Sequence, residues 1–177
     1  EHIIHRRIRP IFNASGDVVS TLTVVEDITE STRKSDELAR SQHRLKAILD
    51  TIPFPLSLKD LEGRILLVNQ AGEDLRGMSA QALIGKHNLE TGLAAQPEVV
   101  RILQESHQKV LRTGERDEIH ENWITRADGQ RICEQVVKVP FRETDNSITG
   151  VISIGIDVTA RIEAERTLRE QRQLLET

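Results

Sequence analysis

Apolar and polar residues alternate with a period of two in some segments of the chain and with a helical period in others. The two-residue period, bounded by Gly, Asn and Asp turns, predicts β-strands. These strands cover residues 2–12, 18–26, 56–59, 64–68, 119–125, 131–139 and 148–156. The helical period predicts helices over residues 71–78, 79–85 and 97–113. Within residues 51–158 this order is typical of an α+β domain with helices on one face of an antiparallel sheet.

Two further segments carry apolar or small residues at alternating steps of three and four, as in a heptad. They run from Ile28 to Ile52 and from Val158 to Leu175, and several core positions are polar. We therefore expect weak helix pairing that modest forces can shift. The positions expected at a helix–helix contact in a homodimer are Leu38, Leu45, Leu49 and Ile52. A surface helix packed on its own domain is the alternative.

The chain also contains an internal repeat at an offset of 130 residues. Identical residues at this offset are the pairs Pro10 and Pro140, Asp27 and Asp157, Thr29 and Thr159, Leu38 and Leu168, and Leu45 and Leu175. One complete unit over residues 51–158 is therefore expected, preceded by the last hairpin of a similar unit at 1–27. A linker helix over 28–50 would join them, and it would recur as an outgoing helix over 159–177.

Composition narrows the class of protein. The 24 Lys and Arg against 28 Asp and Glu give a net charge of −4, which argues against a nucleic-acid partner. No stretch approaches the ~18 apolar residues that a membrane-spanning helix needs. A single Cys excludes an internal disulfide and favours a reducing, cytoplasmic setting.

The ordered motifs of the complete unit resemble the PAS family, the sensory modules of bacterial signalling proteins. The matching segments are residues 52–53, 59–65, 68–71, 77–79, 83–86, 113–115, 128–129, Pro140, 150–152 and 157–159. The resemblance implies a five-stranded antiparallel sheet with helices over one face. It also implies an interior that can hold a small ligand.

The junction between the last strand and the outgoing helix carries Asp157 and Thr159. A carboxylate or hydroxyl there can accept the free N–H groups of the first helical turn. The resemblance implies that this junction is where the signal leaves the domain, and that Asp27 and Thr29 serve the upstream domain in the same way. A plain helix cap is compatible with that role.

Alternation and helix faces also predict the residues that line the interior. The inward candidates are Leu58, Leu66, Val68, Leu75, Leu83, Leu103, His107, Trp123, Val137, Ile152 and Ile154. They would form an aliphatic cavity with one indole and one imidazole, suited to a small, partly apolar ligand. A packed core without ligand is an equally open interpretation.

Cofactor signals are weak, and we favour no bound cofactor over flavin or haem. Light-sensing flavin members carry a reactive Cys on a helix, whereas Cys133 lies on a late predicted strand. Haem-binding members carry a His where Leu103 stands, and His107 lies one turn later. No His shows metal-ligand spacing with a nearby carboxylate or Cys.

Catalytic motifs are missing from the sequence, which favours a regulatory role. There is no nucleophile elbow, phosphate loop or carboxylate pair, and His43 lacks the flanking residues of a kinase phosphoacceptor. We expect a sensor that transmits a ligand or redox cue through its flanking helices to a C-terminal output domain. By resemblance that domain would be a histidine kinase, a cyclic-dinucleotide enzyme or another PAS domain. The alternative is a ligand-free dimerisation and relay module.

Overall fold

The computed structural model describes residues 2–175, apart from the side chain of Leu175. The chain divides into two compact units, Glu1–Ala47 (unit 1) and Ile48–Thr177 (unit 2). The ends of the predicted hairpin and outgoing helix, at residues 1, 176 and 177, lie outside the described residues. No helix in the described part of the chain is long and apolar enough to cross a membrane.

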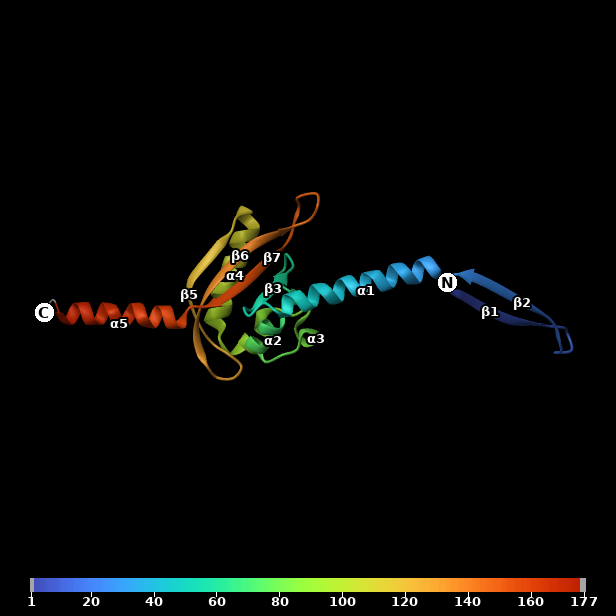
Figure 1. The fold of residues 1–177 in the computed structure, drawn as a ribbon, viewed down its shortest axis with the longest axis horizontal. Helices are drawn as coiled ribbons and strands as arrows, with labels where there is room; N and C mark the ends of the chain where they lie inside the picture. The colour runs from blue at the N-terminus through green and yellow to red at the C-terminus, as the bar shows by residue number, and fades with distance from the viewer. Residues whose placement is uncertain (1, 176–177) are drawn as a thin grey trace. The chain divides into compact units, whose positions relative to one another are not determined.

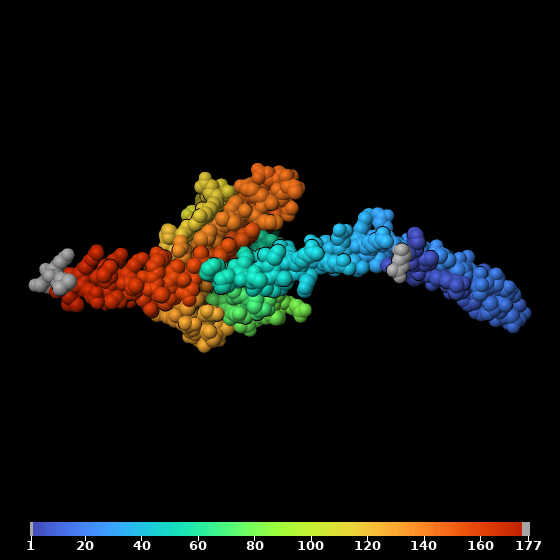
Figure 2. All heavy atoms as spheres, in the orientation of Figure 1, coloured from blue at the N-terminus to red at the C-terminus, as the bar shows by residue number. Residues whose placement is uncertain are grey.

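Unit 1 begins with an antiparallel hairpin of β1 (Ile4–Phe12) and β2 (Val18–Asp27), as predicted (Figure 1). The turn is fixed by Asn13, whose side-chain oxygen accepts the N–H groups of Ser15 and Asp17 at 2.9 Å each. Every residue of both strands is exposed, and their apolar side chains lie open to solvent (blue in Figure 2). An isolated hairpin of this kind is only marginally stable in water.

Helix α1 (Thr29–Asp50) follows the hairpin and contains no fully buried residue. It ends at Asp50, shortly before Pro53, which disfavours helical geometry in the residue that precedes it. The N–H groups of Thr51 and Ile52 close a last turn on the carbonyls of Ile48 and Leu49, at 3.2 Å each.

The sheet of unit 2 is five-stranded and antiparallel, with the order β4-β3-β7-β6-β5. Its strands are β3 (Leu56–Lys59), β4 (Ile65–Val68), β5 (Asp117–Thr125), β6 (Arg131–Arg142) and β7 (Ile148–Asp157). Strand β7 returns to the centre of the sheet between β3 and β6, so the first and last strands of the unit are neighbours (Figure 1).

Helices cover one face of this sheet, and α5 leaves from its last strand. The helices are α2 (Gln70–Arg76), α3 (Ala80–Leu83), α4 (Pro97–Thr113) and α5 (Thr159–Leu175), with 3₁₀ turns η1 (Asn88–Glu90) and η2 (Gly92–Ala95). The α+β prediction and the five-stranded sheet are confirmed. The two 3₁₀ turns lie where the sequence predicted no element.

The side chain of Asn69 organises the start of unit 2. Its side chain is fully buried, and its oxygen accepts the N–H of Gly72 in α2 at 3.0 Å and that of Leu56 in β3 at 2.9 Å. Its amide nitrogen donates to three carbonyl groups, those of Leu49, Ile52 and Phe54, at 2.9–3.2 Å. One side chain therefore joins the end of α1 to the sheet and to α2.

The hydrophobic core of unit 2 includes two small clusters of buried side chains. One contains Ile65, Val68 and Leu83, and the other contains Leu75, Ile124 and Ile132. Charged and polar side chains occupy much of the remaining space between the sheet and the helices. That polar interior contains the candidate site.

Candidate functional site

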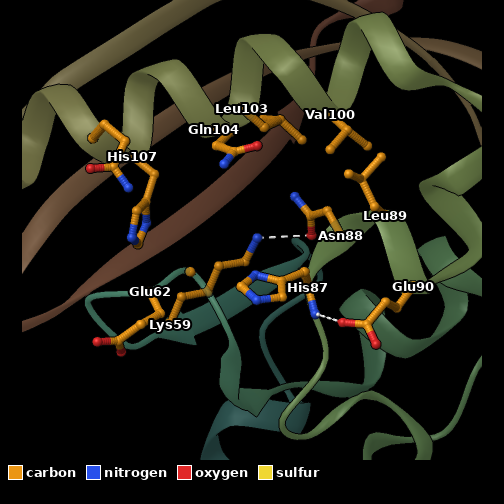
Figure 3. Close-up of a pocket in the computed structure, with 12 residues that line it drawn as sticks. Lys59, Glu62, His87, Asn88, Leu89, Glu90, Val100, Leu103, Gln104 and His107 are labelled. Carbon is orange, nitrogen blue, oxygen red and sulfur yellow. Dashed lines mark hydrogen bonds between the residues drawn. The ribbon is translucent and has the colours of Figure 1, made fainter.

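A cavity of about 400 Å³ lies between α4, the β3–β4 turn and η1 (Figure 3). We call it the outer cavity. Its apolar side is formed by Leu89, Val100 and Leu103, and its polar side includes Lys59, His87, Asn88 and His107. Its size falls within the range of small-molecule sites, and it has the mixed lining that such sites share.

Two lysines are buried on the helix-covered face of the sheet, beside the outer cavity. Lys59 is 8% exposed and donates from Nζ to Asn88 Oδ1 at 2.8 Å. Lys138 is 2% exposed and donates to the backbone carbonyl of Leu103 in α4. Burial, followed by the Arg76 and Lys138 cations, holds the pKa of Lys59 well below its ordinary value. Burial also lowers the pKa of Lys138 to about 7.

His107 projects from α4 into the outer cavity, where its ring faces the lysine (Figure 3). It is 4% exposed, and among the described residues its Nε2 atom has no hydrogen-bond partner. Burial, then the cations of Lys138 and Lys59, lower the pKa of His107 to about 4. The imidazole is therefore neutral at neutral pH and can either donate or accept a hydrogen bond.

A second polar group lies deeper, around Arg76 and Glu134. Arg76 donates from Nη1 to the Gly72 carbonyl at 3.0 Å. Burial raises the pKa of Glu134 to about 7, with Arg76 opposing the shift and Asp157 adding to it. A void of about 30 Å³ separates these side chains from Ser57, which leaves space for one water molecule. We call it the inner void.

The junction of β7 with α5 is held by the residues that the sequence predicted. Asp157 Oδ1 accepts the backbone N–H of Thr159 at 2.9 Å and its hydroxyl at 2.6 Å. The same hydroxyl oxygen accepts the N–H of Cys133 in β6 at 2.9 Å, and the N–H of Val158 donates to the Cys133 carbonyl at 2.8 Å. The first turn of α5 is thus hydrogen-bonded to two strands of the sheet.

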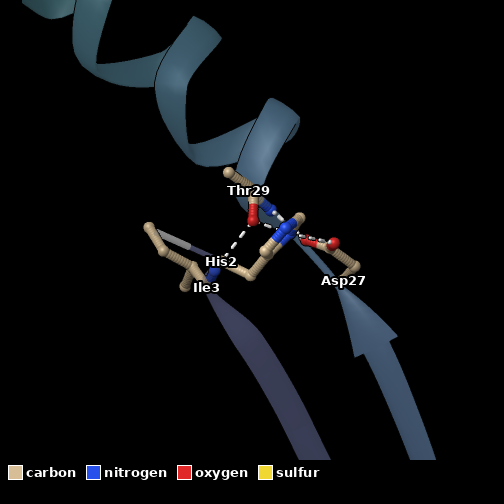
Figure 4. Close-up of polar contacts among 4 residues, drawn as sticks. All are labelled: His2, Ile3, Asp27 and Thr29. Carbon is tan, nitrogen blue, oxygen red and sulfur yellow. Dashed lines mark hydrogen bonds and ion pairs between the residues drawn. The ribbon is translucent and has the colours of Figure 1, made fainter.

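Unit 1 carries the same constellation at the start of α1 (Figure 4). Asp27 Oδ1 accepts the N–H of Thr29 at 3.0 Å and its hydroxyl at 2.5 Å, and Thr29 accepts the N–H of Ile3 at 2.7 Å. The N–H of Ile28 donates to the Ile3 carbonyl at 2.9 Å. His2 adds a contact to Asp27 at 2.9 Å.

The predicted interior residues divide into two groups. Val68, Leu75, Leu83, Leu103 and His107 do lie in the interior: the first three belong to the hydrophobic clusters, and Leu103 and His107 line the outer cavity. Leu103 also borders the inner void, so it separates the two spaces.

The other predicted interior residues were assigned to the wrong face of the sheet. Leu58, Trp123, Val137, Ile152 and Ile154 alternate along their strands with residues that face the helices. Across the sheet Leu58 pairs with Ile152, Val137 with Ile154, and Trp123 with Cys133. Leu66 is also misplaced, because it is 48% exposed. The inward residues of these strands include Lys59, Lys138 and Glu134, so hydrophobicity alone selects the opposite face.

The predicted dimer residues lie in two settings. Leu38 and Leu45 are 60% and 54% exposed on α1. Leu49 and Ile52 are half-buried, and their carbonyls accept from Asn69 within unit 2. Whether they contact a second chain stays a prediction.

Cys133 lies on β6, as expected, and its thiol is free and buried. Within residues 2–175 no three His, Cys, Asp or Glu side chains converge to form a metal site. Sequence reasoning did not identify Lys59, Lys138 and Asn88 as site residues. Lys59 and Lys138 are charged residues in strands, and the sequence alone does not show whether such a side chain faces the interior or the solvent.

Comparison with known proteins agrees with this architecture. The chain matches the PAS fold family over residues 43–158. It is 28% identical to the virulence sensor protein BvgS of Bordetella pertussis over 131 residues, 73% of this chain and 10% of BvgS. It is 30% identical to the methanogenesis regulatory histidine kinase FilI of Methanothrix harundinacea over 141 residues, 80% of this chain and 15% of FilI.

Solved structures show the same fold. The PAS domain of Bordetella pertussis BvgS superimposes with a TM-score of 0.57 and 26% identity, covering 76% of this chain and 98% of that domain. VqmA of Vibrio cholerae, in a complex with ligand and DNA, gives a TM-score of 0.58 and 26% identity over 64% of this chain and 50% of VqmA.

The fold defines a sensory module of the α+β class. The chain belongs to the PAS family. It spans only a small part of the sensor proteins that it matches, 10% of BvgS and 15% of FilI.

The expectation of no nucleic-acid partner is wrong as a general exclusion, because VqmA combines this fold with DNA binding. The net charge of −4 is the sum over these 177 residues alone. It carries no information about a DNA-binding segment elsewhere in a longer polypeptide.

Proposed function

We propose that unit 2 is a regulatory, non-catalytic sensor whose outer cavity binds a small molecule and whose sheet passes the change to α5. The observation that carries this proposal is the Thr159 hydroxyl, which bonds to Cys133 of β6 and to Asp157 of β7. A rearrangement of either strand alters the first turn of the outgoing helix.

Strand β6 is the element that links cavity and helix. Lys138 reaches α4 beside the outer cavity, and Glu134 borders the inner void on the same strand. Cys133, next to Glu134, holds Thr159. A ligand that displaces Lys138 therefore acts on the strand that positions the start of α5, and small shifts of this kind bias two-state elements.

We further propose that residues 1–27 are the last hairpin of a preceding PAS-like domain and that 28–50 form the linker helix. The matching constellations of Asp27 with Thr29 and Asp157 with Thr159 support this assignment. So does the register, because Pro10 and Pro140 occupy equivalent positions and a register shift follows two residues later in both hairpins.

An output domain connected through α5 completes the proposal. The relative FilI is a histidine kinase, which favours a kinase in a two-component system. VqmA supports a DNA-binding output, while a cyclic-dinucleotide enzyme or another PAS domain stays open. The single, free cysteine is compatible with a cytoplasmic setting.

A ligand-free relay and dimerisation module is the second candidate. It is favoured by the inner void, which at about 30 Å³ is too small for anything larger than water. In that case dimer contacts at Leu38 and Leu45, rather than occupancy of the cavity, would set the state of the helices.

Hydrogen exchange of the full chain distinguishes the candidates. Small metabolites are first screened for those that raise the unfolding temperature of the chain. Amide hydrogen exchange in α4 and in the first turn of α5 is then compared with and without each compound. The sensor requires slower exchange in both regions for the wild type, and in α4 alone for Thr159→Val. If the ligand slows exchange in α4 of the wild type but leaves exchange in α5 unchanged, the proposed transmission from the cavity to α5 is ruled out. If no compound affects either region, the ligand-free module is favoured.

A further inference from the structure

Two lysines with lowered pKa values are buried beside the outer cavity: Lys59 lines it, and Lys138 bonds to the carbonyl of Leu103, which also lines it. Lys59 Nζ bonds to the neutral amide of Asn88, and Lys138 Nζ bonds to the neutral carbonyl of Leu103. Among residues 2–175, neither lysine forms an ion pair. The two lysines point to the same face: Lys59 pairs with Val151, and Lys138 pairs with Ser153 two residues further along β7.

One carboxylate lies near Lys138: Asp117 of β5 pairs with it across the sheet, and its negative charge opposes the lowering of the Lys138 pKa. Asp117 accepts hydrogen bonds from Lys109 and Ser106, at 2.6 Å each. Glu134 lies beside Arg76 at the inner void rather than in the outer cavity.

Two glutamates border the mouth of the outer cavity and do not neutralise the lysines. Glu90 accepts the backbone N–H of His87 at 2.9 Å, and its carboxylate turns toward that group (Figure 3). The carboxylate of Glu62 points away from the cavity (Figure 3). Both side chains belong to exposed residues, where water screens their charge.

The cavity also has an apolar surface, flanked on α4 by Gln104 and Gln108. Leu89, Val100 and Leu103 face the polar groups across the open space (Figure 3). The neutral His107 projects from the same helix as Val100 and Leu103, and its Nε2 atom has no hydrogen-bond partner among the described residues. The arrangement combines a cationic end, one adaptable hydrogen-bonding group and an aliphatic surface.

We propose that the outer cavity binds a small organic acid, with its carboxylate held by Lys59 and His107 near Lys138 and its apolar body against Leu89, Val100 and Leu103. This inference rests on the sensory function proposed above. Burying ammonium groups without a counter-charge is unfavourable, and an organic anion offsets that cost. An uncharged ligand would not offset the free-energy cost of burying the ammonium groups.

Binding should therefore be coupled to proton uptake. A carboxylate beside Lys138 favours the charged ammonium, whose pKa of about 7 in the free protein leaves it only partly protonated at neutral pH. Affinity for the acid should fall as the pH rises through 7 and above. Calorimetry in buffers of different ionisation enthalpy would detect the proton taken up.

The test uses the 177-residue chain with benzoate and hexanoate, their neutral amides, and inorganic phosphate. We expect the two acids to raise the unfolding temperature and the amides and phosphate to leave it unchanged. In Lys59→Met, affinity for the acids should fall by roughly 30-fold or more, since half of a buried charge pair is removed. Because methionine removes an unpaired buried charge, the unliganded variant should be at least as stable as the wild type.

Two further variants complete the design. Lys138→Met should also weaken binding of the acids and reduce the proton uptake, with any remaining uptake assigned to Lys59. Lys34→Met makes the same chemical change on α1, where Lys34 pairs with Glu30 at the surface, and should bind like the wild type.

Other outcomes would contradict the inference. Equal binding of amides and acids, or full binding by Lys59→Met, would show a neutral-ligand cavity and leave the sensory proposal standing. If phosphate bound as tightly as benzoate, the apolar residues of the cavity would contribute nothing to the affinity. If neither acid binds at millimolar concentration, the organic-acid assignment is wrong, and the exchange experiment with metabolites decides the sensory role separately.

Discussion

The backbone N–H of Cys133 donates to the hydroxyl oxygen of Thr159 across 2.9 Å, and that hydroxyl in turn donates to Asp157 at 2.6 Å. The contact crosses from β6 to the first residue of α5. A side-chain cap usually satisfies the helix alone. Here Asp157 accepts the first helical N–H and the hydroxyl of Thr159 accepts the N–H of a strand, so the helix start and the sheet share one hydrogen-bond network.

Replacing Thr159 with valine should loosen this connection. Valine keeps the branched shape but removes the hydroxyl, which leaves the Cys133 N–H unpaired. We expect a loss of about 0.5–2 kcal/mol in the free energy of unfolding, measured by urea denaturation. Amide exchange at Cys133 should accelerate.

Thr167→Val is the matched control, because the Thr167 hydroxyl bonds only to the Glu163 carbonyl within α5. It should change the free energy of unfolding by much less and leave the exchange of Cys133 unaltered. Equal effects of the two variants would mean that the hydroxyl of Thr159 is an ordinary helix contact.

Asn69 should be among the polar residues least tolerant of substitution in unit 2. Asn69→Ala removes the partner of two N–H groups and three carbonyls, and some of them are sealed from water. We expect a loss of about 1–3 kcal/mol or more, measured by urea denaturation. Gln70→Ala, which removes only a surface bond to Asp74, should cost far less. A similar loss for both would argue against an organising role.

Local signals in the sequence were sufficient for the order of elements, the helix caps and the junctions. Asp157 and Thr159 bond to each other two positions apart, which a capping pattern reveals, whereas the bond from Cys133 to Thr159 and most of the bonds of Asn69 join distant parts of the sequence. The orientation of the sheet was not predictable in this way. Leu58 and Ile152 face outward while Lys59 and Lys138 face inward, which inverts the usual rule for a strand with one buried face.

The candidate site was only partly predictable for the same reason. Leu103 and His107 lie on α4, whose buried stripe has a helical period that the sequence shows clearly. Asn88 lies in a 3₁₀ turn without a sequence pattern of its own, and its contact with Lys59 joins residues 29 positions apart. Such pairs depend on the tertiary fold.

Glu134 should make stability depend on pH. Its pKa is raised from 4.5 to about 7 in the folded chain, so between these values the unfolded chain has lost a proton that the folded chain keeps. Its contribution to stability therefore decreases as the pH rises from about 4.5 to 7 and then stays constant.

Comparison of the wild type with Glu134→Gln at pH 5 and pH 8 isolates this effect. The glutamine variant should gain about 1–3 kcal/mol relative to the wild type between the two pH values, measured by urea denaturation. Glu143→Gln, at an exposed position in the β6–β7 turn, should show no such gain. A constant difference between wild type and Glu134→Gln would mean that Glu134 ionises normally in the fold.

Dimerisation through α1 is the remaining prediction, and it rests on the exposed apolar residues Leu38 and Leu45. Their seven-residue spacing places both on one helix face, and nothing in the described part of unit 1 covers them. Leu38→Glu with Leu45→Glu should convert a dimer to a monomer in sedimentation velocity, because four carboxylates would then face one another across the seam. His43→Glu with Ala47→Glu introduces two carboxylates on the opposite face and should leave the dimer intact. A dimer that survives the leucine substitutions would place the contact elsewhere, and loss of the dimer in both double variants would point to charge rather than to the leucine seam.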